Sequence, residues 1–243
     1  MSAMATSEWT TKASPHFTAR MAGFFWLMTA VTGSLALSSD KLVVLSDGAA
    51  TAANILTHNS LFRFGIVSYL VASICYLTAT VLVYHLLKPV SRNVSLVAAF
   101  FSLAGCAVAG VSFVLNLAPS VILSGAQNAA VFSTAQSQAL ALMFLKIRGS
   151  AFFVSHVFFG FHCLLVGWLI LRSTFLPRFV GSLMVFAGLG WLTLSLGNLL
   201  APEFGRLLFP YLLAPGAIGE ITLSLWLLAK GVNEQGWLEN PRV

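Results

Sequence analysis

One acidic side chain lies in the middle of an apolar run. The chain has seven Asp and Glu residues, and among them Glu220 falls deep within a segment long and apolar enough to cross a membrane. A charge at the centre of a bilayer costs roughly 2.5–3.5 kcal/mol on insertion scales. We therefore expect Glu220 to be protonated, hydrogen-bonded or beside a wet cavity. It is a candidate acid/base group, proton site or ligand anchor, and the alternative is a structural hydrogen bond between helices.

His162 is the candidate partner of Glu220. Each residue lies about 12 positions from the same side of its predicted span, which is roughly 18 Å at 1.5 Å per residue. The two side chains meet if the fourth and sixth spans are neighbours. Glu220 and His162 would then be the candidate catalytic residues of an intramembrane enzyme. The alternative for His162 is an ordinary core histidine.

Further polar residues are expected nearer the outer side of the membrane. They open or close a span or lie one to two turns inside it: Arg63, Asn116, His156 and Asn198. Together with His162 and Glu220 they are predicted to line a ligand-binding cavity that opens outward. Arg63 and Asn198 also fit side chains that simply lie at the level of the lipid headgroups.

Several metal and cofactor chemistries lack the residues they need. The sequence has no HExxH, CxxC or paired-Asp motif, no glycine-rich phosphate loop and no Lys placed within a span for a Schiff base. A bis-histidine haem site needs facing histidines, whereas His156 and His162 share one predicted helix. Cys75, Cys106 and Cys163 lie inside apolar runs, where cysteine is usually a small hydrophobic residue. We expect no metal site and no cofactor.

The composition determines the fold class. Hydrophobic residues make up 58% and charged residues 8% of 243 positions, against about 25% charged residues in soluble proteins. Apolar runs of spanning length recur along the chain. The sequence predicts an all-α polytopic membrane bundle with six transmembrane helices over 21–37, 62–87, 94–117, 150–171, 179–199 and 208–229. This transmembrane domain, 21–230, is flanked by cytoplasmic tails at 1–20 and 231–243. A cleaved signal peptide is the alternative for the first span.

The loops suggest an orientation. Two short turns, one with Lys88 and Arg92 and the other with Arg172 and Arg178, carry positive charge without an acid. Such turns are typical of the cytoplasmic side, which predicts both termini inside. The net charge of +6 is then explained by topology and by contact with membrane lipids, and we expect no nucleic-acid partner. The longer outer loops are predicted to hold short interfacial helices at 49–56 and 136–147.

Several stretches resemble one known family. They are LFRFGI (61–66), LLKPV (86–90), HVFFGFHCLLVGWLILRSTFLPRFVG (156–181) and PGAIGEITLSLWLLAKGV (215–232). The chain is similar from about Arg20 to Val232 to an uncharacterised bacterial family of six-helix membrane proteins, domain of unknown function 4386. The resemblance implies a multi-pass protein of the bacterial cytoplasmic (inner) membrane and includes Arg63, His162 and Glu220. It implies no substrate or activity.

Three functions fit these observations. The favoured hypothesis is that the protein binds or moves a small, mostly apolar molecule through the outward cavity, with Glu220 as anchor or proton site. One alternative is an intramembrane enzyme acting on a lipid, isoprenoid or quinone through Glu220 and His162. The other is a structural or accessory subunit in which the polar groups only fix helix packing. The sequence leaves the ligand and the oligomeric state open.

Overall fold

The fold is an all-helical membrane bundle. A computed structural model describes residues 14–124 and 131–239, except for the side chains of residues 206, 209 and 210. Every regular element in those ranges is a helix, and six of the helices are long and apolar enough to cross a membrane. The predicted fold class is therefore confirmed. Residues 1–13 and 240–243 of the two predicted tails lie outside the described residues.

The helices extend beyond the apolar runs that predict them. Their bounds are α1 (Pro15–Asp40), α2 (Gly48–Thr57), α3 (Asn59–Leu87), α4 (Arg92–Ser124), α5 (Thr134–Arg172), α6 (Arg178–Leu200), α7 (Pro202–Ala229) and α8 (Glu234–Leu238). Two of the longer ends, at α1 and α5, begin at capping serines in the polar flanks. The hydroxyl of Ser14, for example, accepts the backbone N–H of Phe17 at 3.1 Å and starts α1 within the predicted tail.

Two helices continue where the sequence predicts a break. The short helix expected at 136–147 is the first part of the 39-residue α5, which begins at a capping box between Ser133 and Gln136. Gly149 lies at the junction, and one glycine costs only about 1 kcal/mol inside a helix. Likewise α4 runs past Pro119, which removes one backbone hydrogen bond without ending the helix. The other predicted loop helix is present as α2.

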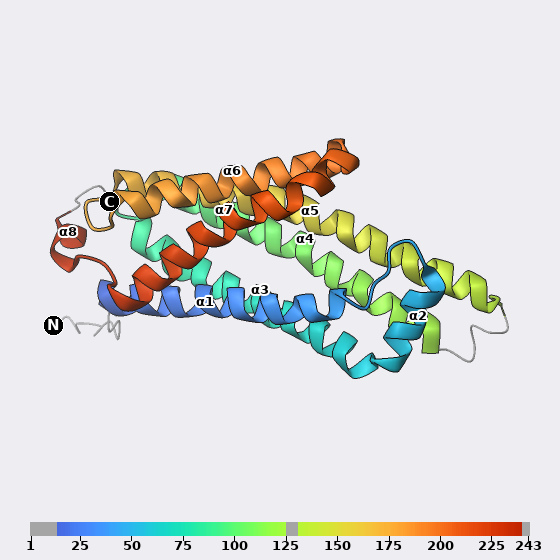
Figure 1. Cartoon of the computed structure of the whole chain (residues 1–243). Helices are drawn as coiled ribbons and strands as arrows, with labels where there is room; N and C mark the ends of the chain where they lie inside the picture. The colour runs from blue at the N-terminus through green and yellow to red at the C-terminus, as the bar shows by residue number, and fades with distance from the viewer. Residues whose placement is uncertain (1–13, 125–130, 240–243) are drawn as a thin grey trace, which may run out of the picture.

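The six long helices form a closed ring. In order around it, α1 packs on α3, α3 on α4, α4 on α5, α5 on α6, α6 on α7, and α7 again on α1. Figure 1 shows α7 crossing the bundle obliquely, with the start of α1 and helix α8 at one end. We call this end the terminus end and the opposite one the α2 end. Side chains from all six helices meet inside the ring.

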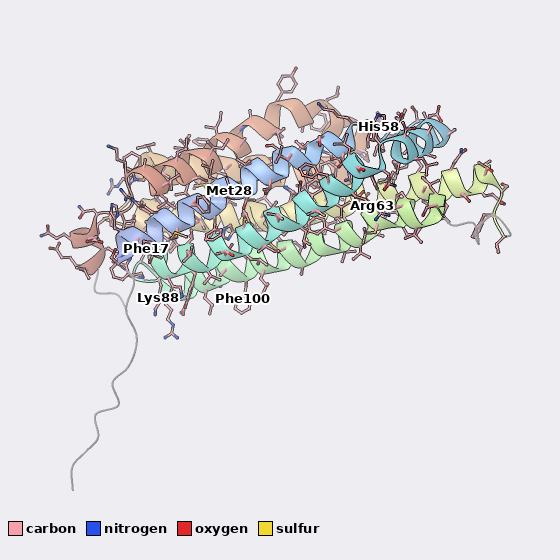
Figure 2. All side chains as sticks on the ribbon, turned by 90° about the horizontal axis from the view of Figure 1, so that it is seen from below. Phe17, Met28, His58, Arg63, Lys88 and Phe100 are labelled. Carbon is pink, nitrogen blue, oxygen red and sulfur yellow. The ribbon has the colours of Figure 1, made fainter. Side chains whose placement is uncertain are left out.

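The outside of the ring suits lipid. Large apolar side chains stand on its surface, including Phe17 and Phe100, which are 58% and 61% exposed. Figure 2 shows α1, α3 and α4 side by side, with the ring of Phe100 pointing away from the bundle. Water would disfavour so much apolar surface, whereas lipid chains do not.

Glycines let α5 and α6 approach closely. A Cβ atom on Gly188 would lie 2.7 Å from the carbonyl oxygen of Gly160, and one on Gly167 would lie 2.8 Å from that of Gly181. Both pairs are backbone contacts between antiparallel helices. Small residues allow this kind of packing in membranes, where van der Waals contact drives helix association. The α5–α6 pair thereby holds His156, His162 and Trp191 on one rigid unit.

Candidate functional site

Glu220 is bound by two tryptophans. Its Oε2 accepts a hydrogen bond from Nε1 of Trp26 at 2.9 Å, and its Oε1 accepts one from Nε1 of Trp191 at 2.7 Å. The donors come from α1 and α6, the two neighbours of α7 in the ring. Indole N–H groups can only donate, so both carboxyl oxygens act as acceptors, as they do in an ionised carboxylate. In the described part of the chain, no basic side chain forms an ion pair with Glu220.

Two glycines bring these tryptophans within reach. A Cβ atom on Gly216 would lie 2.6 Å from the indole of Trp191, so that ring lies directly on the turn of α7 before Glu220. A Cβ atom on Gly23 would lie 2.6 Å from the carbonyl oxygen of Ser224, so α1 touches α7 beside Trp26. The hydrogen bonds to Glu220 therefore depend on backbone contacts on both sides of α7.

His162 lies close to these tryptophans and forms no hydrogen bond with Glu220. It is 1% exposed, and its Nδ1 is 2.8 Å from the carbonyl oxygen of Ala98 on α4. Its ring centroid lies 5.8 Å from that of Trp26 and 5.7 Å from that of Tyr76. Its Nε2 makes no hydrogen bond among the described residues. No hydrogen bond joins His162 to Glu220 among the described residues, because α6 lies between α5 and α7 in the ring and the two indoles occupy the carboxyl oxygens.

The remaining members of the cluster are aromatic. Tyr76 packs edge-on against Trp26, with ring centroids 5.4 Å apart. His156 lies 4.8 Å from Trp191 between ring centroids, and its Nδ1 is 2.8 Å from the carbonyl oxygen of Phe152. We call this set the polar–aromatic centre: Trp26, Tyr76, His156, His162, Trp191 and Glu220.

The other predicted ligand-binding residues lie outside this centre. Arg63 donates from Nε to Oδ1 of Asn59 at 2.8 Å on the exposed surface of α3 (Figure 2). Asn198 donates to the carbonyl oxygen of Leu194 in its own helix at 2.9 Å. Asn116 is 1% exposed on α4, and its Oδ1 has no partner among the described residues. The structure thus brings together Glu220, His162 and His156 and leaves Arg63, Asn116 and Asn198 apart.

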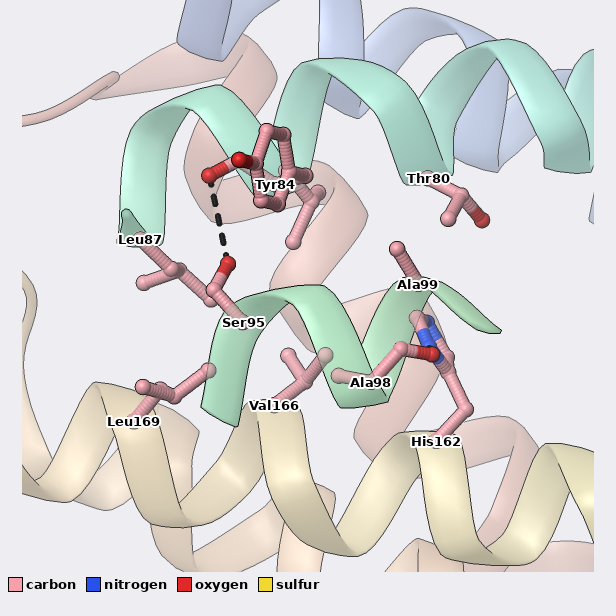
Figure 3. A pocket seen from close by; sticks show the side chains of 10 residues that line it. Thr80, Tyr84, Leu87, Ser95, Ala98, Ala99, His162, Val166 and Leu169 are labelled. Atoms are coloured by element: carbon pink, nitrogen blue, oxygen red, sulfur yellow. Dashed lines mark hydrogen bonds between the residues drawn. The ribbon is translucent and has the colours of Figure 1, made fainter. Parts of the chain in front are cut away.

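The open space near the centre is narrow. A narrow crevice without room for a water molecule lies between α3, α4 and α5, on the side of the centre that faces the terminus end. Figure 3 shows His162, Thr80 and Ser95 along it, with the Ser95 hydroxyl bonded to the backbone oxygen of Tyr84. A second crevice, with a volume of about 10 Å³, is lined by Leu176 and by apolar side chains of α3, α5 and α7. Both are too tight for an organic ligand as they stand, so a ligand needs the helices to separate.

The tryptophans are the site residues that sequence reasoning misses. Trp26 and Trp191 resemble ordinary apolar side chains in a span, whereas the isolated charge draws attention to Glu220. One signal is available, because an indole N–H deep in a membrane needs an acceptor. The described residues contain no cluster of three His, Cys, Asp or Glu side chains arranged for a metal ion.

Comparison with known proteins identifies the family. Residues 21–231 match the family described as a domain of unknown function, DUF4386, so the chain belongs to that family. An uncharacterised protein from Archaeoglobus fulgidus is 27% identical over 175 residues, which cover 69% of this chain and 84% of the relative. No solved structure matches. The family and the helices together show a multi-pass membrane protein.

Proposed function

We propose that this member of the DUF4386 family binds a small, mostly apolar molecule at the polar–aromatic centre and moves it from the outer side of the membrane, with Glu220 as the polar anchor. The observation that supports this most is the carboxyl group of Glu220, which lies deep in the bundle. It accepts hydrogen bonds from two neutral indoles and forms no ion pair with a cation among the described residues. An ionisable residue inside a membrane usually serves a substrate or ion.

The remaining hydrogen-bonding capacity of Glu220 indicates the polar part of the ligand. A carboxylate offers about four lone-pair sites, and the indoles of Trp26 and Trp191 occupy two of them. An ammonium, amide N–H or hydroxyl group on the ligand fits the others. The aromatic rings of Trp26, Tyr76 and Trp191 supply an apolar wall that suits the body of the molecule.

Opening between α1 and α7 offers the simplest route to the carboxylate. The hydrogen bond from Trp26 to Glu220 crosses the contact between these helices. A ligand donor that replaces the indole of Trp26 would release α1 from α7, so binding and opening are coupled. We place the opening on the outer side and both termini in the cytoplasm of a bacterial cell, on the strength of the basic turns at Lys88 and Arg172.

An enzymatic role remains a second candidate because of one observation. The Nε2 of His162 is buried and free of hydrogen bonds in the described chain, as a base awaiting a substrate would be. The candidate is weaker, because Glu220 and His162 make no hydrogen bond and an acid/base pair would need Trp26 to move. Loss of turnover of a lipid, isoprenoid or quinone in His162→Gln, with ligand binding retained, would favour it.

Native mass spectrometry of gently solubilised protein tests the proposal. The wild type, Glu220→Gln and the control Glu239→Gln, which changes a surface carboxylate on the C-terminal side of α8, are compared. We expect a co-purifying small molecule in the wild type and the control and its loss in Glu220→Gln. Equal occupancy in all three proteins would refute the anchor role. A wild type without ligand, beside a Glu220→Gln protein that is merely less stable, would support a structural role instead.

A further inference from the structure

A second group of polar side chains lies at the α2 end of the ring. Arg148 on α5 forms an ion pair with Asp40 on α1, with Nη1 2.7 Å from Oδ1, and Tyr69 on α3 donates its hydroxyl to Oδ2 of Asp40 at 3.0 Å. Asp40 is 14 residues beyond Trp26 in α1, which is about 21 Å along the helix. This group is therefore separate from the polar–aromatic centre.

Helix α4 adds a row of polar atoms without partners. Ser112, Asn116 and Ser120 are spaced four residues apart, so they share one face of the helix. All three are buried, with Asn116 only 1% exposed, and none of their side-chain oxygens makes a hydrogen bond within the described residues. Buried polar atoms are nearly always bonded, and lipid offers no substitute for water. Three unpartnered oxygens on one helix face therefore indicate a hydrogen-bonding group that is not part of the described chain.

The pairing of α4 with α5 places Asn116 opposite Arg148. The ring of Phe159 on α5 lies against Gly105 on α4, where an added Cβ atom would be only 2.7 Å from it. Eleven residues make three helical turns. Asn116 follows Gly105 by eleven residues and Arg148 precedes Phe159 by eleven in the antiparallel helix, so Asn116 and Arg148 lie at about the same level of these two helices.

A contact between two aromatic rings independently supports this placement of Asn116. Tyr69, the partner of Asp40, stacks on Phe113 of α4 with ring centroids 5.9 Å apart. Phe113 lies within one turn of Asn116. The Nε of Arg148 is also buried and unbonded in the described chain. An unused donor on α5 and an unused acceptor on α4 therefore lie at the same level of the bundle.

We propose that these residues form a binding site for the neutral hydroxyl head of a long-chain, alcohol-like lipid. The head-group site comprises Asp40, Tyr69, Ser112, Asn116, Ser120 and Arg148. A hydroxyl group can accept from Nε of Arg148 and donate to Oδ1 of Asn116 at the same time. A charged head fits poorly, because Asp40 already balances the charge of Arg148.

The lipid-facing surface of α4 beside the site suits the apolar chain of such a lipid. Val114 and Leu117, within one turn of Asn116, are 67% and 48% exposed. The proposal concerns a site away from Glu220 and does not depend on the function proposed for that residue.

Photocrosslinking in lipid nanodiscs tests the head-group site. The probe is a long-chain alcohol with a diazirine near its hydroxyl, and the modified peptides are mapped by mass spectrometry. We expect crosslinks on α4 and α5 around Asn116 and Arg148, which excess unlabelled alcohol prevents and an alkane of equal length does not. Asn116→Leu should lower the crosslinking about fivefold, the value of roughly one hydrogen bond.

Two variants serve as controls. Asn198→Leu changes an asparagine whose amide is bonded within its own helix, and Glu220→Gln changes the other centre; both should crosslink as the wild type does. Asn116→Leu removes an unpartnered oxygen, so a thermal melt should show that it still folds. If it did not fold, the Ser112→Ala, Ser120→Ala double variant would take its place, with the same expected loss of crosslinking.

Three results would overturn the proposal. Unchanged crosslinking in a folded Asn116→Leu protein would show that the amide makes no contact with the head group. Equal competition by the alkane would indicate an apolar groove alone. Stronger competition by a fatty acid than by the alcohol would show that the site selects an anion.

Discussion

Replacing Trp191 by Phe should measure how much its hydrogen bond to Glu220 stabilises the ring of helices. The change keeps an aromatic ring against Gly216 and removes the Nε1–H group that lies 2.7 Å from Oε1 of Glu220. Hydrogen bonds to charged groups contribute about 1.5–3 kcal/mol in soluble proteins, whereas polar contacts between membrane helices average about 0.6 and reach about 1.7 kcal/mol. Because this hydrogen bond is short and joins two membrane helices, we expect a loss of about 1.5 kcal/mol in the free energy of unfolding, near the upper end of the range for membrane helices.

The same interaction can be tested by changing Glu220 instead of Trp191. In Glu220→Gln the amide keeps one acceptor oxygen and gains an NH2 donor. One indole then keeps its hydrogen bond, and the other faces a second donor. In the double variant Trp191→Phe, Glu220→Gln, the remaining indole of Trp26 can bond the amide oxygen. We therefore expect the double variant to lose about 1 kcal/mol less than the sum of the single variants.

Unfolding by sodium dodecyl sulfate in mixed micelles can be followed through a thiol reagent. Cys163 is fully buried, so its modification rate reports loss of the packed bundle. Trp168→Phe is the matched control, because Trp168 is 40% exposed and its change should fall within about 0.5 kcal/mol. Strictly additive single and double variants would refute the reasoning, since they would show that the indole and the carboxyl group do not depend on each other.

Two further predictions concern packing and orientation. Gly188→Val should destabilise the bundle by about 3 kcal/mol in the same assay, because a Cβ atom there would lie 2.7 Å from the carbonyl oxygen of Gly160 and helix backbones cannot yield as side-chain ends do. Gly110→Val, which has open space around it, is the control, and equal losses in the two would contradict the contact. With the native cysteines replaced by alanine, a membrane-impermeant maleimide should label Ala135→Cys in intact cells and Asn93→Cys only after lysis; the opposite pattern would reverse the orientation.

The apolar runs predict the spanning helices because insertion into lipid depends on local composition. Helix ends are another matter. The sequence predicts a separate interfacial helix at 136–147, followed by a span from 150, with Arg148 and Gly149 between them. In the structure α5 continues through these residues without a break. A charged segment ends the contact with lipid, but it does not end the backbone hydrogen bonds that continue a helix.

The candidate site is partly predictable for the same reason. Depth along a helix follows from residue number, so Glu220 and His162 are expected near one level, and the structure places both in the polar–aromatic centre. The order of helices around the ring depends on which side faces pack, as at Gly160 and Gly188. Hydropathy carries no such information. The position of α6 between α5 and α7 therefore cannot be predicted from the sequence, and neither can the role of Trp191.

The length of α5 has a mechanical consequence. Its 39 residues make a rod of about 58 Å, nearly twice the thickness of a hydrocarbon core of about 30 Å. The helix starts at the capping box of Ser133 and runs without a proline to Arg172. Helix α2 packs against its first turns. A displacement of α2 would therefore be passed along one continuous helix toward His162, which lies more than seven turns from the start of α5.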